Sequence, residues 1–199
     1  MRIAALTASL LAVAAFTCSP VRADFDGNVN FFLGEKNLDS GDWKPLENQF
    51  EFGAVMSFGA KDWPVQIAAD VLISVDETTV YDGFLGDVTF TGTTFEFDAG
   101  FRWLIYKKGK VFPYIGAGVG IIGAAVQLDD GFDTVDANDA SLGFWADGGV
   151  FFQLGGHFNI GVDLRYSDAS VDLDYGSAIV AQDVNAGGFS YGLLLGFGW

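Results

Sequence analysis

Eight stretches of this chain carry apolar side chains at every second position, and no other feature of the sequence restricts its fold as much. Successive side chains of a β-strand point to opposite faces, so each stretch predicts a strand with one apolar face. Many of these apolar positions are aromatic, since the chain has 20 Phe. The apolar positions extend over residues 25–33, 50–58, 65–73, 95–105, 115–121, 142–154, 158–166 and 189–199.

The opposite face of the same stretches carries glycine, carboxamide and charged side chains. Counting from the short connections places most of the charged residues about six to eight residues up their strands, at one level. Six carboxylates then face two guanidinium groups, which predicts either a plug of salt bridges or a path for protons or cations. The charged positions are Glu51, Asp70, Glu96, Asp98, Arg102, Asp147, Asp163 and Arg165.

Strands with these two faces fit a closed barrel in lipid better than a soluble fold. Eight strands enclose only enough space for side chains or one small ligand, so the Phe-rich faces cannot all point inward. A soluble β-sandwich would leave the same faces without a cover. If the apolar faces point into lipid, barrel closure pairs the backbone groups and the charged residues are enclosed.

Residues 111–128 contain no charged residue, which is also typical of a membrane-spanning helix. However, Pro113 and four glycines interrupt the stretch, and its apolar residues recur with a period of two. The glycines at 118, 120 and 123 match a dinucleotide-binding pattern, but that pattern requires a turn between a strand and a helix. We interpret these glycines instead as lining the crowded interior of a small barrel.

The connections between the stretches alternate in length and charge. Short connections at residues 60–64, 107–111 and 155–157 alternate with much longer ones. Segments 76–92, 127–140 and 167–184 contain four, five and four acidic residues and no Lys or Arg. Outer-membrane barrels combine short periplasmic turns with long outer loops. The prediction is an all-β, eight-stranded antiparallel transmembrane β-barrel with short periplasmic turns and long acidic outer loops.

The N-terminal residues 1–23 are predicted to be a signal peptide, and residues 24–199 to form the barrel. Arg2 precedes an apolar segment too short to span a bilayer, and Ala23 is a suitable residue before a cleavage site. Lipidation at Cys18 is the alternative, although the preceding residues fit a lipobox poorly. Cell outer-membrane localisation follows from export combined with a barrel.

The composition excludes several other classes of function. With one Cys and one His, the chain lacks the residues for a zinc site or a disulfide framework. A net charge of −16 argues against a nucleic-acid partner. The single His157 lies in a short connection, at the wrong end for a lipid A hydrolase. We therefore expect no enzyme activity, no cofactor and no bound metal, since Asp129-Asp130-Gly131 does not match an EF-hand loop.

Three segments resemble the small outer-membrane β-barrel family, which includes the OmpA membrane domain, OmpX and OmpW. Residues 113–120 (PYIGAGVG) resemble a typical strand of the family, and residues 161–166 (GVDLRY) resemble its next-to-last strand. The last strand is similar to the signal that the barrel assembly machinery reads, and its apolar positions are Phe189, Tyr191, Leu193, Leu195, Phe197 and Trp199. The resemblance covers residues 24–199 and implies a compartment, but no activity.

These features predict an integral outer-membrane barrel with a plugged polar lumen and a structural or surface-recognition role. The alternative is a narrow pore or conduit for small, including hydrophobic, solutes. Expected partners are outer-membrane lipid, lipopolysaccharide and the barrel assembly machinery, and the barrel itself is expected to be a monomer. The acidic rim is interpreted as a solvated charged surface, and the alternative is that it binds divalent cations that bridge lipopolysaccharide phosphates. An aromatic girdle is expected at the end with short turns, formed by Trp63, Tyr106, Phe112 and Trp199.

Overall fold

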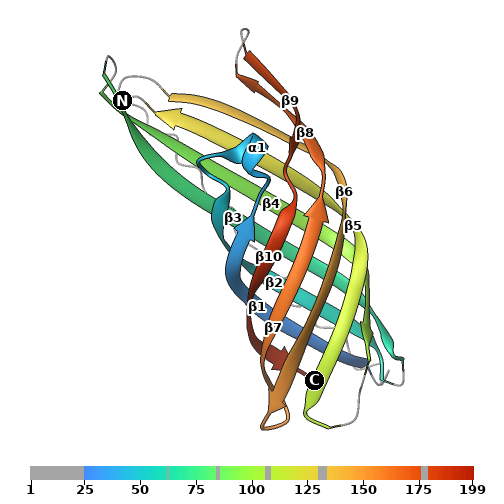
Figure 1. Cartoon of the computed structure of the whole chain (residues 1–199). Helices are drawn as coiled ribbons and strands as arrows, with labels where there is room; N and C mark the ends of the chain where they lie inside the picture. Colours follow the sequence, from blue (N-terminus) through green and yellow to red (C-terminus); the bar gives the residue numbers. More distant parts are fainter. Residues whose placement is uncertain (1–24, 62, 84–85, 106–108, 130–133, 176–178) are drawn as a thin grey trace, which may run out of the picture.

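The computed structural model of this chain describes residues 25–61, 63–83, 86–105, 109–129, 134–175 and 179–199 (Figure 1). The predicted signal peptide, residues 1–23 with Cys18, lies outside the described residues, as does Tyr106. The elements are β1 (Phe25–Asn37), α1 (Ser40–Trp43), β2 (Asn48–Ala60), β3 (Val65–Asp82), β4 (Gly86–Leu104), β5 (Val111–Asp129), β6 (Thr134–Leu154), β7 (Phe158–Asp168), β8 (Ser170–Tyr175), β9 (Ile179–Asn185) and β10 (Gly188–Gly198).

Eight of the strands form a closed barrel in the order β1-β10-β7-β6-β5-β4-β3-β2, and every neighbouring pair is antiparallel. The first and last strands close it, pairing from Asn28 opposite Gly198 to Asn37 opposite Phe189. Closure leaves no sheet edge, as a structure in hydrocarbon requires. The predicted eight-stranded antiparallel barrel is thus confirmed.

The side chains follow the predicted alternation between the two faces of the wall. Along β7, exposed and buried residues alternate without interruption from Phe158 to Ser167. On β4, Phe97 and Phe101 are 52% and 64% exposed, while Asp98 between them is 5% exposed. The six aromatic and leucine residues of the predicted assembly signal, from Phe189 to Trp199, all lie on the exposed face at the C-terminal end. The outer surface of the barrel is therefore apolar and its interior contains the charge.

The outer segments differ from the prediction, because two of the expected loops are continuations of strands. The β3–β4 pairing continues to Asp82 opposite Gly86, and the β5–β6 pairing continues to Asp129 opposite Thr134. Residues 76–92 are rich in Thr and Val, which favour strands, so the polar composition of this segment concealed its β-structure. Figure 1 shows both hairpins extending past the barrel at the end where α1, β8 and β9 lie.

The one-turn helix α1 and the β8–β9 hairpin pack over this outer end of the barrel. Trp43 is 4% exposed, and its indole Nε1 donates a hydrogen bond to the backbone oxygen of Asn185 at 2.7 Å. Together these segments enclose an apolar cluster, the outer cap, whose buried members are Leu38, Trp43, Ile122, Ala124, Ala137, Ala169, Val171, Leu173, Val184 and Ala186. Among the described residues no helix is long and apolar enough to span a bilayer.

Candidate functional site

A network of charged side chains crosses the middle of the barrel interior. Arg102 on β4 and Arg165 on β7 are each 2% exposed and belong to different sides of the barrel. Asp70 on β3 connects them, because its Oδ2 accepts from Arg102 Nη2 at 2.8 Å and from Arg165 Nη1 at 2.9 Å. One carboxylate therefore links three strands that are not all neighbours in the barrel.

Three further carboxylates complete the pairing of the two guanidinium groups. Arg102 also donates from Nε and Nη2 to Asp147 on β6, the former at 3.0 Å. Arg165 donates from Nη2 to Asp98, and its Nε lies 3.5 Å from Glu96 Oε2. Removing one partner of a buried ion pair strongly destabilises the fold, because the remaining charge stays desolvated.

Trp145 fills the space between the two arginines. Its ring centroid lies 4.6 Å from Arg165 Cζ and 5.5 Å from Arg102 Cζ, which is within the range of cation–π attraction. The ring stands over two glycines of neighbouring strands, Gly100 and Gly118. A Cβ atom at Gly118 would lie 2.1 Å from the backbone oxygen of Ala99 and 2.8 Å from Trp145 Nε1. The glycines of β5 therefore serve the packing of the interior, within a continuous strand.

Lys36 is a third interior cation, and it lies beyond residues 25–33, the first stretch that the alternation predicts as a strand. Strand β1 continues to Asn37, so the side chain of Lys36 follows Asn28 and Asn30 on the inner face. Its Nζ donates to Glu96 Oε1 at 2.7 Å, to Thr94 Oγ1 at 3.1 Å and to the backbone oxygen of Ala186 at 3.1 Å. Extending the alternation of the first stretch by three residues, from Leu33 to Lys36, would have found it.

Two interior carboxylates have no cationic partner within hydrogen-bond distance among the described residues. Asp163 Oδ2 accepts a hydrogen bond from the Tyr114 hydroxyl, while its Oδ1 has no partner there. Glu51 is 1% exposed and its Oε2 likewise has no partner in the described chain. All eight charged residues named from the sequence thus lie in the interior, and six carboxylates meet three cations there. The excess of carboxylate oxygens can hold protons or water.

The interior also contains large apolar side chains, which the sequence analysis did not expect on this face. They pack beside the charged network as well as below it, because Val55 is paired opposite Asp70 and Leu72 opposite Glu96, while Leu104 and Tyr114 are paired nearer the end with short turns. Phe112, expected in the aromatic girdle, packs against Phe151 with ring centroids 5.1 Å apart; of the other girdle candidates, Trp63 and Trp199 are exposed. The buried members of this interior apolar cluster are Phe32, Val55, Leu72, Leu104, Tyr114, Phe151 and Leu194.

The outer rim presents acidic side chains that bind backbone groups. Asp139 Oδ2 accepts from the Asp172 amide at 2.9 Å, and Asp172 Oδ1 accepts from the Asp183 amide at 3.1 Å. The hydrogen bond from the Asp172 amide lowers the pKa of Asp139 below its ordinary value. Among the described residues, no three Asp, Glu, His or Cys side chains converge as a metal ion would require.

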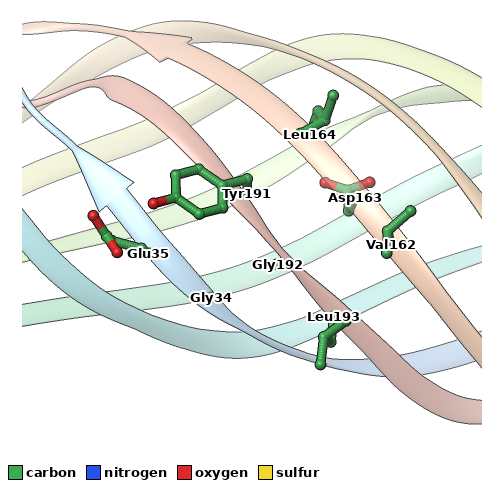
Figure 2. Close-up of a pocket in the computed structure, with 8 residues that line it drawn as sticks. All are labelled: Gly34, Glu35, Val162, Asp163, Leu164, Tyr191, Gly192 and Leu193. Carbon is green, nitrogen blue, oxygen red and sulfur yellow. The ribbon is translucent and has the colours of Figure 1, made fainter.

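A hollow of about 490 Å³ lies in the wall formed by β1, β10 and β7 (Figure 2). The ring of Phe32 lies on the inner side of this wall, where a Cβ atom at Gly34 or Gly192 would be 2.8 or 2.6 Å from its Cζ. The hollow is therefore backed by Phe32 and gives no evidence of a passage into the lumen. Its lining residues are Gly34, Glu35, Val162, Asp163, Leu164, Tyr191, Gly192 and Leu193.

A catalytic arrangement around His157 finds no support in the geometry. His157 lies in the β6–β7 turn, and its Nδ1 is 3.1 Å from the backbone oxygen of Gly198. This is the end of the barrel opposite the outer cap, where the C-terminus lies (Figure 1). The imidazole is thus held by the C-terminal strand, far from the interior carboxylates.

A closed antiparallel barrel of eight strands, apolar outside and charged inside, is the architecture of the small outer-membrane β-barrel proteins. Ail, the attachment invasion locus protein of Yersinia pestis, was solved in complex with the heparin analogue sucrose octasulfate; it is 14% identical, with coverage of 88% of this chain and 97% of Ail and a TM-score of 0.55. The outer membrane protein OprG of Pseudomonas aeruginosa is 17% identical, with coverage of 89% and 96% and a TM-score of 0.54. No family model and no curated relative matches the sequence. These likenesses establish the fold.

Proposed function

We propose that this protein is an integral outer-membrane barrel with a closed interior, whose role is structural or depends on recognition at its outer surface. The observation that carries the proposal is the bridging of Arg102 and Arg165 by Asp70 across the lumen. Apolar side chains pack around this network: the outer cap covers it at one end, and the interior apolar cluster lies beside it and toward the end with short turns. A lumen filled in this way supports no open aqueous pathway.

Single-channel recording in planar bilayers tests the closed interior. The folded protein, identified by its heat-modifiable migration on gels, is expected to give no unitary currents, while a large porin in the same bilayer verifies the assay. Trp145→Ala provides the matched variant, because it removes the largest side chain between the two arginines. Reproducible ohmic steps from the unmodified protein would refute the closed lumen and favour the narrow pore.

The outer surface is suited to cationic partners. Acidic residues are concentrated in segments 76–92, 127–140 and 167–184, which contain no Lys or Arg. Ail was solved with an anionic sulfated ligand. The acidic rim of this protein has the same sign of charge as such a ligand, so it is expected to repel the ligand and to attract basic peptides or divalent cations that bridge lipopolysaccharide phosphates.

Binding of labelled basic peptide and of heparin to the protein in nanodiscs tests this surface. Peptide binding that weakens with salt, with no heparin binding, is the expected result. Asp172→Asn combined with Asp183→Asn is expected to weaken peptide binding, since both carboxylates lie exposed on the outer hairpin. Calorimetric titration with Ca²⁺ is a separate experiment. If it gives no heat of binding, the divalent-cation role is excluded, and the basic-peptide role is then decided by the peptide-binding experiment.

We also propose outer-membrane residence, export by the N-terminal segment, handling by the barrel assembly machinery and a monomeric state. The exposed apolar wall supports residence in a membrane, because side chains such as Val119 and Phe197 are 63% and 62% exposed. Membrane fractionation and recovery of the protein in the outer-membrane fraction test this assignment. Catalysis is not part of the proposal, and an unchanged lipid A mass spectrum on overexpression is the expected result.

A further inference from the structure

A layer of neutral hydrogen-bonding side chains closes the barrel interior at the end opposite the outer cap. Four of its members are linked in sequence across β7, β1 and β2. Asn159 Nδ2 donates to Asn30 Oδ1 at 3.1 Å, and Asn30 Nδ2 donates to Asn28 Oδ1 at 2.9 Å. Asn28 Nδ2 then donates to Ser57 Oγ at 2.9 Å. All four residues are at least nine-tenths buried.

Every hydrogen bond of this series points in the same direction. A side-chain donor therefore remains at one end of the series and a side-chain acceptor at the other. Ser57 Oγ donates to Gln66 Oε1 at 2.6 Å, so Gln66 takes part through its acceptor and its Nε2 donor is not used in the series. At the other end, Asn159 is fully buried and its Oδ1 has no partner among the described residues. An unpartnered buried oxygen costs free energy unless a ligand or water supplies a donor.

The layer opens into a cavity of about 320 Å³ at the same end of the barrel. Asn28, Gln66 and Gln153 contribute carboxamides to its lining, and Asp26 is the one charged side chain among the described residues that line it. At Gly198, which also lines it, a Cβ atom would lie 2.8 Å from Gln153 Nε2 and 3.5 Å from Asn159 Nδ2. Glycine at this position therefore leaves space at the point where two carboxamides converge.

Aromatic residues also line this cavity, Phe112 and Phe151 from the barrel interior and Trp199 at its rim. The Trp199 side chain is 58% exposed, and its ring lies against Gly27, where a Cβ atom would be 2.4 Å from Trp199 Cζ2. The backbone of Trp199 is fixed by two hydrogen bonds with Gly27, at 3.0 and 3.2 Å. The Trp199 ring is thus held on the outer face of the wall, beside the mouth of the cavity, while Phe112 and Phe151 form the apolar part of the lining inside.

We propose that this cavity is a binding site for a neutral sugar, of the N-acetylated hexosamine class. Carboxamides donate and accept at once, which matches sugar hydroxyl groups and an acetamide substituent. The rings of Phe112 and Phe151, which line the cavity from the barrel interior, offer an apolar surface to the C–H face of a pyranose. A volume of about 320 Å³ lies at the small end of ligand sites and suits one or two sugar units. With one carboxylate and no cation among the described lining residues, the site does not favour an anionic ligand.

A sugar site in this cavity goes beyond the proposed function, because the cavity lies at the end of the barrel opposite the outer cap. In the proposed orientation the cavity faces the periplasm, where a neutral glycan would anchor the barrel from below. Binding itself requires neither that orientation nor a closed lumen. A test with the isolated barrel therefore separates the failure of this proposal from the failure of the proposed function.

Titration of the protein in nanodiscs with N,N′-diacetylchitobiose is the direct test, followed by the side-chain carboxamide signals in ¹⁵N NMR. Saturable shifts at Asn28, Gln66 and Gln153 with millimolar affinity are the expected result. Cellobiose, which lacks the acetamide groups, and a neutral tripeptide are the comparison probes. Tighter binding of chitobiose than of cellobiose supports the proposal, whereas equal affinities would assign recognition to the hydroxyl groups and overturn the hexosamine class. Binding of the tripeptide alone, or of no probe, overturns it.

Gln153→Ala and Gln127→Ala form the matched pair of variants. Gln153 lines the cavity and is half-buried, so its replacement is compatible with folding and is expected to weaken chitobiose binding about fivefold to tenfold. Gln127 is exposed on the outer extension of β5, and its replacement is expected to leave binding unchanged. Equal affinities for the two variants would place the ligand elsewhere and overturn the assignment.

Discussion

The carboxylates inside this barrel and those on its outer rim are the same chemical group in two different environments. Inside, Asp70 is 2% exposed and accepts from two guanidinium groups, each on a different strand. On the rim, Asp172 is exposed and its carboxylate accepts from a backbone amide. The difference teaches that the acidic composition serves two purposes: the interior acids hold opposite walls together, whereas the rim acids present charge to solvent.

Replacing Asp70 with Asn should give the largest change in stability. Both arginines would lose a common partner and remain desolvated, which costs about 3–5 kcal/mol for a buried pair. Urea unfolding of the protein in lipid vesicles, followed by tryptophan fluorescence, measures the difference. If the variant is as stable as the unmodified barrel, the interior acids contribute no more to stability than those of the rim, and the proposed difference between the two groups is wrong.

Replacing Gly118 with Val tests whether the interior is filled around the network. The new side chain would collide with Trp145 and the opposing backbone, and overpacking of this kind costs about 1–3 kcal/mol. The adjacent Ala117 points to the exposed face, so Ala117→Val should change the stability by less than about 0.5 kcal/mol. The same unfolding experiment compares the two variants, and equal losses would argue against a face-specific effect.

Replacing Asp172 with Asn is the rim counterpart of the Asp70 variant. An exposed substitution away from the packed interior should alter global stability by no more than about 0.5 kcal/mol. Hydrogen exchange should show faster exchange only at the Asp183 amide, whose acceptor would be weaker. A global loss comparable to that of Asp70→Asn would mean that the rim acids also carry the fold.

The smallest effect is expected from the titration of Asp139. Because its folded pKa is lowered, ionised Asp139 stabilises the outer hairpin at a pH above its unfolded pKa, and this contribution is lost as the pH falls through the lowered pKa. The Asp172 amide donates the hydrogen bond responsible, so its exchange should accelerate under acidic conditions. Unchanged exchange of that amide across the titration would contradict the assigned cause.

The candidate site could be predicted where its residues belong to a clear alternation, and was missed where the alternation was less regular. Glu96 and Arg102 follow a strict pattern, so their inward orientation was predictable from β4 alone. Lys36 was missed because a glycine-containing, polar segment surrounds it, which is also typical of a loop. Phe32, Leu72 and Leu194 were missed because they are apolar on a face identified by its polar members. Packing of the interior requires such apolar residues, but the sequence of a single strand does not indicate at which inward-facing positions they lie.

The sequence alone determined the class of fold, the strand faces and the charge of the interior, because side-chain direction in a strand is a local property with a period of two. Only the tertiary structure decided which carboxylate meets which cation, since these pairs join strands that closure of the barrel brings together. Asp70 and Arg165 are 95 residues apart in the chain and form a hydrogen bond of 2.9 Å. The register between neighbouring strands, and the space left by glycines such as Gly118, set that geometry, and neither is encoded in any one strand.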